Sequence, residues 1–209
     1  LDVFSDDILQ IAAVQLKNGA VVPGSAMSIY LESDKEIPEM LGDIVNPIIE
    51  ERRHHQLISR QDALQRFVDY AQGTVLLGHN ADFDIHILTN NLLRELPECP
   101  LPENLNNYLD SLLLIRLLRP GLRQYKLKYL LEVLHLEGEN SHLADADVNA
   151  TRSLTAFCYN HAREMVAEQQ SFITHKRVQE RVVTLRNNYL SHFHHTANRL
   201  WTNDDNKDL

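Results

Sequence analysis

A nine-residue apolar stretch followed by a turn places the strongest constraint on how this chain can fold. Residues Ile8–Leu16 (ILQIAAVQL) are apolar on both faces of an extended strand, which is typical of a strand buried inside a sheet. Asn18-Gly19 follows, and both residue types adopt the positive φ angles of a tight hairpin turn. Ser25–Glu32 is the predicted returning strand. We therefore expect an antiparallel pair inside an α/β sheet.

Helical and extended segments alternate along the rest of the first 160 residues, which indicates one α/β domain. A short buried strand, Thr74–Gly78, is expected between two helices. From about His161 to Trp201 the pattern stays helical, without proline or glycine. We therefore predict a domain over residues 1–160 and a helical extension or linker over 161–209. The expected helices of the domain are 60–71, 84–95, 111–118, 126–136 and 147–159.

Composition narrows the class of protein. Hydrophobic residues make up 44% and charged residues 23%, as in ordinary water-soluble domains, and no run is long enough to span a membrane. The two cysteines give no disulfide framework, and the first residues are acidic, so a cytoplasmic location is expected. A net charge of −9 argues against a protein that holds nucleic acid by bulk positive potential. It does not argue against a metal site built from carboxylates.

The first candidate site is the segment GHNADFD, from Gly78 to Asp84, where a strand ends and a helix begins. Ligands bind at the carboxyl ends of strands in α/β sheets, and Asp84 falls in the first turn of the predicted helix. An alternative interpretation is structural, because Asn80 or Asp82 in this position is also a common helix cap.

The second candidate is HLADAD, from His142 to Asp147, which also leads into a helix. A histidine five positions before an aspartate is a weak signal alone, because the chain has 11 His and 15 Asp residues. Capping by Asp145 or Asp147 is again the structural alternative. The order of the two segments, each between an expected strand or loop and a helix, strengthens the functional interpretation.

Together these segments resemble a known family. HN-x-x-FD after a strand, then H-x4-D within HLADAD, resembles two motifs of the DEDDh 3′–5′ exonucleases, which include the proofreading subunits of bacterial replicases. The stretch ILQIAAVQL-KNG, the segment Leu109–Leu112 and the segment Tyr125–Leu130 are similar to other parts of that family, in the same order. The resemblance covers residues 1–158. It implies an α/β fold of the ribonuclease-H-like type, with a mixed sheet flanked by helices, here followed by the helical extension.

The resemblance also implies an activity, namely hydrolysis of DNA from its 3′ end to nucleoside monophosphates with two Mg²⁺ or Mn²⁺ ions. In that pattern Asp84 and Asp147 are metal ligands, and His142 is the general base that activates water. His79, Asn80 and Phe83 fall where the family binds nucleotide. The expected partners are single-stranded DNA 3′ ends, RNA as an alternative, and a fused or associated polymerase or helicase, with no membrane.

One motif of the family is absent. The family's D-x-E-T-x-G strand supplies two further metal ligands, and Asp2, Asp6 and Asp7 do not have its spacing, so we interpret them as loop acids. We expect the natural protein to extend upstream and the 209-residue chain to be inactive without that strand. Two alternatives stay open: an RNA-trimming exonuclease, and a non-catalytic domain that binds nucleic acid or protein.

Five basic residues lie close together between the two motifs. They either flank a substrate groove or form a solvated helix surface: Arg116, Arg119, Arg123, Lys126 and Lys128.

Overall fold

The computed structural model describes residues 2–35, 42–138 and 143–171. Its described strands are β1 (Gln10–Ala13), β2 (Leu16–Lys17), β3 (Ala20–Val21), β4 (Met27–Leu31), β5 (Leu57–Ile58), β6 (Leu76–Gly78) and β7 (Tyr108–Asp110). Its described helices are α1 (Gly42–Arg52), α2 (Arg60–Ala71), α3 (Ala81–Glu95), α4 (Ser111–Leu118), α5 (Leu127–Val133) and α6 (Ala144–Ser171), with a 3₁₀ turn at Glu103–Asn106. No described helix combines the length and apolar character that a membrane span needs.

The strands form a mixed arrangement, as predicted, but they are divided into separate sheets. β1 runs antiparallel to β4, with Gln10 opposite Tyr30, and β4 runs parallel to β5. β6 and β7 form their own parallel pair, which ends with Gly78 opposite Asp110. β2 and β3 make a short separate hairpin.

The predicted hairpin turn is confirmed, but the two long strands around it are broken. Asn18 and Gly19 have φ angles of 53° and 72°. The break lies at Gln15, whose backbone N–H donates to the Ser25 hydroxyl at 3.1 Å instead of to a neighbouring strand. Pro23 has no N–H to offer, and Gly24 has a φ of 75°, so the returning chain also leaves the strand here.

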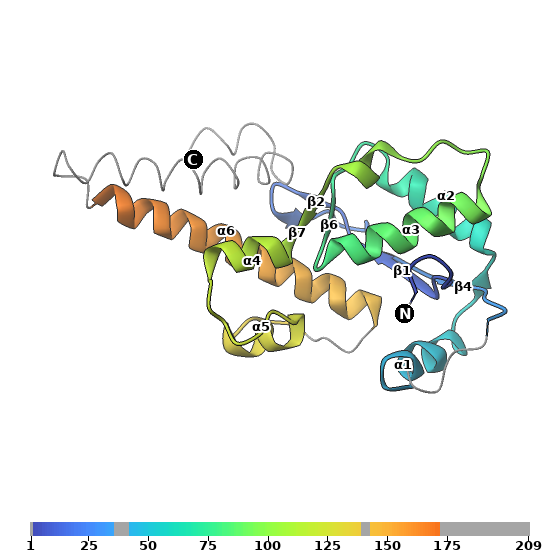
Figure 1. The fold of residues 1–209 in the computed structure, drawn as a ribbon, viewed down its shortest axis with the longest axis horizontal. Coiled ribbons are helices and arrows are strands. Elements are labelled where there is room, and N and C mark those ends of the chain that lie inside the picture. The colour runs from blue at the N-terminus through green and yellow to red at the C-terminus, as the bar shows by residue number, and fades with distance from the viewer. Residues whose placement is uncertain (1, 36–41, 139–142, 172–209) are drawn as a thin grey trace.

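Helices cover the sheets from two sides (Figure 1). α2 packs against β4, and α3 packs against α2, β6 and β7, whereas α6 packs against β1 and against α4 and α5. α6 runs without a break through the predicted domain boundary at residue 160, and the extension predicted beyond it lies outside the described residues after Ser171.

The buried apolar side chains form two clusters. One joins α4, α5 and α6 around Leu114, Leu130 and Leu154. The other joins β1, β4, α2 and α3 around Leu31 and Leu64. A domain of this size normally has one continuous core, so two separate clusters are unusual.

The prediction that β1 and β6 are fully buried strands is wrong. Of the four residues of β1 only Ile11 is buried, at 9% exposed, and all three residues of β6 are half-buried. The physical reason is a cavity of about 710 Å³ that both strands line, described next.

Candidate functional site: a carboxylate-lined cavity

The cavity lies between β1 and β6. Its walls come from β1 and the residues up to Leu16, from β6, from the C-terminal end of α2 and from the first turns of α3 and α6. Most lining side chains are apolar, and a few polar groups converge on the space, which is typical of a ligand site. The polar lining residues include His79, Asp84, Asp147, Thr151 and Arg152.

The structure brings both predicted metal ligands, Asp84 and Asp147, to this one cavity. Asp84 lies in the first turn of α3 and Asp147 in the first turn of α6, and both line the space. The first turn of a helix presents backbone N–H groups and the positive end of the helix dipole, so each carboxylate is held where an anion is favoured. Elements that are some sixty residues apart in the chain therefore present acids to the same volume.

The electrostatics of Asp84 are unfavourable to its charged form. Burial and, to a smaller extent, the charges of Asp110 and Asp147 together raise the pKa of Asp84 to about 6, against one opposing hydrogen bond from its own backbone. Asp84 is an exposed residue that lines the cavity, yet the protein around its carboxylate excludes enough water to disfavour the charged form. No Lys or Arg of the described residues forms an ion pair with it.

Gly78 makes room for this carboxylate at the end of β6. A Cβ atom placed on Gly78 would lie 3.0 Å from the Cβ of Ala81 and 3.6 Å from Oδ2 of Asp84. The first distance is shorter than most packing contacts, so the close approach of β6 to the start of α3 favours glycine here.

Asp110 joins the ends of the two parallel strands. Its Oδ1 accepts from the backbone N–H of Asn80 at 2.9 Å and from that of Leu112 at 2.8 Å, so it caps α4 and also holds the start of α3. Asn80 has a left-handed backbone, with φ 64°, and its side chain does not cap α3. The alternative of a cap by Asn80 is therefore wrong. The sequence signal for Asp110 was an aspartate directly before an apolar helix, and we did not predict it as a site residue.

His79 is held by its two ring nitrogens. Nε2 lies 2.9 Å from the carbonyl of Tyr125 and Nδ1 lies 2.9 Å from the Ser111 hydroxyl. A carbonyl only accepts, so Nε2 carries the hydrogen and Nδ1 accepts from Ser111. Burial lowers the pKa of His79, and the charge of Arg116 adds to this, against the carbonyl and Asp110. The ring is thus neutral and bridges β6 to α4 and to the segment before α5.

The predicted nucleotide contacts stay predictions. His79 lines the cavity, Asn80 is exposed beside it, and Phe83 is half-buried in the first turn of α3. The backbone N–H of Phe83 donates to the Asn80 carbonyl at 3.1 Å. The neighbouring Asp82 points elsewhere, since its carboxylate accepts from the Tyr108 hydroxyl.

Asp145 has a different task from Asp147. Its Oδ2 accepts from the Ser28 hydroxyl at 3.0 Å and from the Gln10 side chain at 3.2 Å. The side-chain oxygen Oε1 of Gln10 in turn accepts from the backbone N–H of Ala144 at 3.1 Å. These bonds tie the start of α6 to β1 and β4, and they fix the helix turn on which Asp147 faces the cavity.

A divalent cation fits these residues in kind. Carboxylate oxygens are the ligands that Mg²⁺ and Mn²⁺ prefer, and a bound cation would offset the repulsion that raises the pKa of Asp84. The described residues contain no group of three side chains able to hold a metal ion, so Asp84 and Asp147 supply only part of a ligand set. His142 lies outside the described residues, and its role as general base stays a prediction.

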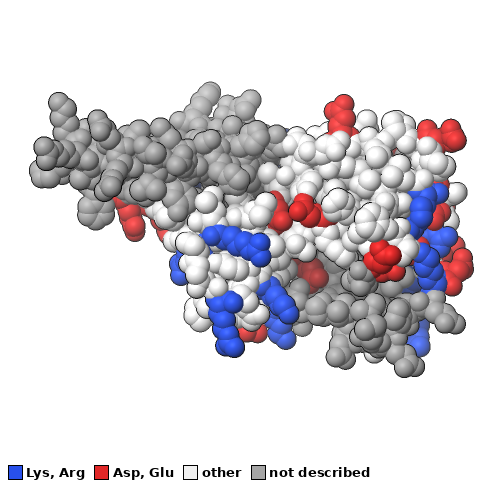
Figure 2. Space-filling model, in the orientation of Figure 1, with Lys and Arg blue, Asp and Glu red and all other residues white. Residues whose placement is uncertain are grey.

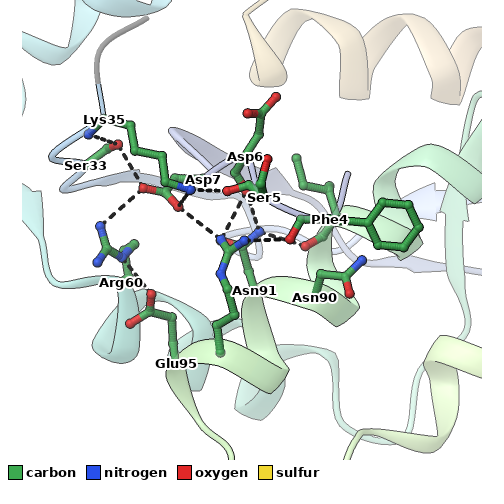
Figure 3. Close-up of polar contacts among 12 residues, drawn as sticks. Phe4, Ser5, Asp6, Asp7, Ser33, Lys35, Arg60, Asn90, Asn91 and Glu95 are labelled. Atoms are coloured by element: carbon green, nitrogen blue, oxygen red, sulfur yellow. Dashed lines mark hydrogen bonds and ion pairs between the residues drawn. The ribbon is translucent and has the colours of Figure 1, made fainter. Parts of the chain in front are cut away.

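The segment before β1 is fixed by a separate polar cluster (Figure 3). The Asp7 side chain is 5% exposed. It forms ion pairs with Lys35 at 3.0 Å, Arg94 at 3.0 Å and Arg60 at 3.3 Å, and it accepts a hydrogen bond from the Ser33 hydroxyl at 3.0 Å. Burial raises the pKa of Asp7, but the bonds from Lys35 and Ser33 and the nearby charges outweigh it and leave this pKa lowered. Asp7 lies in the loop before β1, as predicted, but its side chain is buried and forms the centre of what we call the Asp7 clamp.

The clamp also holds the backbone of residues 3–6. Arg94 donates to the carbonyls of Phe4 and Asp6 at 3.0 and 3.1 Å. Asn90 and Asn91 donate to the carbonyls of Val3 and Asp6, both at 3.1 Å. α3 thus carries Asp84 in its first turn and fixes the N-terminal segment with its last turns.

Comparisons with known proteins agree with this description. The model of the exonuclease family RNase_T matches residues 1–155. The chain is 27% identical over 161 residues to the PolC-type DNA polymerase III of Clostridium perfringens, covering 77% of this chain and 10% of that protein. It is 30% identical over 152 residues to the 3′–5′ exonuclease DinG of Bacillus subtilis, covering 70% of this chain and 15% of that protein.

A solved structure shows the same fold. Exonuclease X, in complex with 5′-overhanging duplex DNA, superposes with a TM-score of 0.53 at 21% identity, over 73% of this chain and 82% of that one. The predicted ribonuclease-H-like fold class is thereby confirmed. The chain belongs to the RNase_T exonuclease family, and so it is an exonuclease domain of the hydrolase class. It spans only 10–15% of the length of these two curated relatives.

Proposed function

We propose that this domain is a metal-dependent 3′–5′ exonuclease that hydrolyses DNA to nucleoside monophosphates. The observation that carries the proposal is the convergence of Asp84 and Asp147, from two helix N-termini, on one cavity where Asp84 has no cationic partner among the described residues. The raised pKa of Asp84 supports it, because such a shift is common where a site awaits an external charge. DinG is a 3′–5′ exonuclease, and exonuclease X is seen with DNA, which also supports it.

In this proposal Asp84 and Asp147 would hold Mg²⁺ or Mn²⁺ ions. Such ions lower the pKa of a bound water and stabilise the charge of the leaving oxygen. His142 takes the proton of the attacking water, which suits a histidine because its ordinary pKa leaves it neutral at working pH. The neutral ring of His79 holds the end of β6 against the start of α4. Asn80 and Phe83 contact the terminal nucleotide. The Asp110 carboxylate keeps Asn80 in its left-handed backbone conformation.

We also propose that an extended segment with two further carboxylates lies in the cavity between β1 and β6. Among the described residues β1 pairs only with β4, and β6 pairs only with β7, so each strand has an open edge. Open edges between apolar neighbours are costly, and a strand inserted there would pair both. It would also join the two apolar clusters into one core. The D-x-E motif that the family resemblance implies would stand on this strand.

A digestion assay tests the function. The protein expressed from the complete gene is incubated with 3′-labelled single-stranded DNA or RNA, in Mg²⁺, Mn²⁺ or EDTA. We expect metal-dependent loss of the 3′ label, and a loss of about 10³-fold or more in Asp84→Asn and His142→Ala. Glu98→Gln, an exposed loop carboxylate, is the matched control and should keep full activity. A folded protein with no cleavage in either metal would overturn the proposal in favour of a binding domain.

The same assay separates DNA from RNA as substrate, because the two labelled strands compete in one tube. The 209-residue chain alone, run in parallel, should be inactive if the two further carboxylates lie on a segment it does not contain. Because the chain spans a small share of a polymerase and of DinG, we propose that it is a module attached to a polymerase or helicase. Reading the complete gene tests this last point directly.

A further inference from the structure

The charge of this molecule is unevenly distributed along the chain. The 209 residues carry 20 Lys and Arg against 29 Asp and Glu. Residues 111–131 carry five basic residues and no acid. We call these five the basic surface: Arg116, Arg119, Arg123, Lys126 and Lys128. In an acidic protein, a segment of 21 residues with five basic side chains and no acidic one is unusual.

The structure gathers these residues on one part of the molecule. All five are exposed, and they extend from α4 through the connecting segment to the start of α5. Figure 2 shows the blue side chains over these two helices. None of the five forms an ion pair with an acid of the described residues, so their positive charge is not neutralised within that part of the chain.

Tyr125 organises the segment that carries them. Its hydroxyl donates to the carbonyl of Arg119 at 3.0 Å and accepts from the backbone N–H of Leu122 at 3.2 Å. The Arg116 guanidinium stands 5.5 Å from the centre of its ring, a cation–π contact. The connection between α4 and α5 is thus folded around Tyr125, which holds the Arg116 side chain and the Arg119 backbone.

The same tyrosine connects the basic surface to the cavity. Its carbonyl accepts from Nε2 of His79 at 2.9 Å, and His79 lines the cavity beside Asp84. The other ring nitrogen of His79 contacts Ser111, the first residue of α4. The His79 side chain therefore lies between the carboxylate site and the start of α4, the helix that carries the first residue of the basic surface.

We propose that the basic surface binds the sugar–phosphate backbone of the nucleic-acid strand whose 3′ end occupies the cavity. The inference rests on the proposed exonuclease function, because that function is what brings a polyphosphate to this side of the molecule. Phosphates repeat along a strand, and Arg and Lys contact them without reading sequence. The basic surface then supplies affinity away from the cleaved bond, which an acidic carboxylate site by itself cannot supply.

Three substitutions test the proposal on the complete gene product. Arg119→Gln, Arg123→Gln and Lys128→Gln are combined because all three residues are exposed, whereas Arg116 is left in place because its guanidinium stacks on the Tyr125 ring. The matched control is Lys17→Gln, Arg53→Gln and Arg66→Gln, which changes net charge equally at exposed positions elsewhere. Binding of a labelled single-stranded DNA of about 20 nucleotides is followed by fluorescence anisotropy in EDTA, at several salt concentrations.

We expect the first triple variant to bind the long strand at least tenfold more weakly. The slope of the logarithm of the binding constant against the logarithm of salt concentration should fall by about 2, because each phosphate contact to a single strand contributes about 0.7. The control triple should leave the slope unchanged. Arg119→Lys with Arg123→Lys keeps the charges and should retain the wild-type slope, which shows that the loss is electrostatic and not a folding defect.

A small substrate separates the two proposals. Thymidine 5′-monophosphate p-nitrophenyl ester, hydrolysed in Mn²⁺, reaches only the cavity, so the triple variant should cleave it at the wild-type rate. Equal DNA binding by both triple variants would overturn the basic surface, whatever the ester shows. Binding of anionic vesicles but not of DNA would overturn it too. Failure of the wild-type protein to cleave the ester and the DNA would instead overturn the exonuclease function.

Discussion

The Asp7 clamp and the Asp84 cavity are both built around an aspartate that α3 helps to position, but they treat its charge in opposite ways. Asp7 is surrounded by Lys35, Arg60 and Arg94, and its pKa is lowered. At Asp84, burial and the charges of Asp110 and Asp147 raise the pKa to about 6. The Asp7 carboxylate is surrounded by cations, whereas Asp84 forms no ion pair with a Lys or Arg of the described residues.

This difference separates structural from functional carboxylates better than position along the chain does. A clamp contributes to stability because its charges are mutually satisfied, whereas a site that is to bind cations must leave its acids uncompensated in the free protein. Contacts elsewhere in the fold must supply the stability that such a site lacks. The Asp7 clamp, which attaches the last turns of α3 to residues 3–7, is one of the contacts that keep α3 in place.

The largest effect should come from breaking the clamp. Asp7→Ala leaves three cations without their shared partner, and removing one member of a buried charge cluster costs roughly 3 kcal/mol. Urea unfolding followed by circular dichroism measures this. Asp62→Ala, which removes an exposed acid from α2, should change the free energy of unfolding by less than about 1 kcal/mol. Equal effects of the two variants would show that the clamp does not stabilise the fold.

Asp84→Asn should act in the opposite direction. It removes a carboxylate whose charged form the fold disfavours, so the metal-free protein should gain on the order of 1 kcal/mol at neutral pH, after solvent screening is allowed for. For a domain of this size that raises the melting temperature by about 2–4 °C. Mn²⁺ should stabilise the wild type and not this variant.

Differential scanning fluorimetry with and without MnCl₂ gives both readings for Asp84→Asn. The control is Asp69→Asn, an exposed acid of α2, which should leave the melting temperature and the Mn²⁺ response unchanged. If Asp84→Asn destabilises the protein as Asp7→Ala does, the contrast between the two regions is wrong.

The two regions should also respond oppositely to pH. The pKa of Asp7 is lowered from 3.8, so its contribution to stability is present above that value and is lost as pH falls through the folded pKa. The pKa of Asp84 is raised to about 6, so its destabilising effect appears as pH rises from 3.8 to about 6. The stability difference between wild type and Asp7→Asn should therefore shrink below pH 3.8. That between Asp84→Asn and wild type should grow up to about pH 6 and then level off.

Much of the fold could be predicted because its signals are local. The bounds of α2 and α4 agree with the predicted ranges, since Ser59 and Asp110 cap them with their own side chains and apolar spacing continues to their ends. The Asn18-Gly19 turn was equally clear, since its backbone demands those residue types. Two-residue β5 and three-residue β7 were missed, because strands so short have no periodicity to detect.

The site was predictable only in part. Asp84 and Asp147 could be identified from motif order, because each stands at a helix start after a recognisable segment. Asp7 could not, because its three cationic partners come from positions 35, 60 and 94, and nothing in a local pattern brings them together. The same holds for Asp145, whose partners Gln10 and Ser28 lie more than a hundred residues away. Long-range pairing is a property of the topology, which the sequence alone indicated only through the family resemblance.

The smallest predicted effect concerns how closely the cavity is built around Asp84. Gly78→Ala places a Cβ atom 3.0 Å from the Cβ of Ala81, so the start of α3 must shift by a fraction of an ångström. We expect a loss of about 1 kcal/mol in stability and about a tenfold weaker Mn²⁺ response, because Asp84 moves with the helix. The Asp7 clamp, at the other end of α3, should stay intact.

A second substitution checks that explanation. Ala81→Gly removes the atom that the new side chain meets, so Gly78→Ala combined with Ala81→Gly should recover the Mn²⁺ response, measured by calorimetric titration. The double variant should not recover full stability, because glycine in a helix is less stable than alanine by up to about 1 kcal/mol. Recovery of metal binding without recovery of stability would locate the effect at the contact between β6 and α3. If metal binding stays weak in the double variant, the position of Asp84 does not depend on this contact.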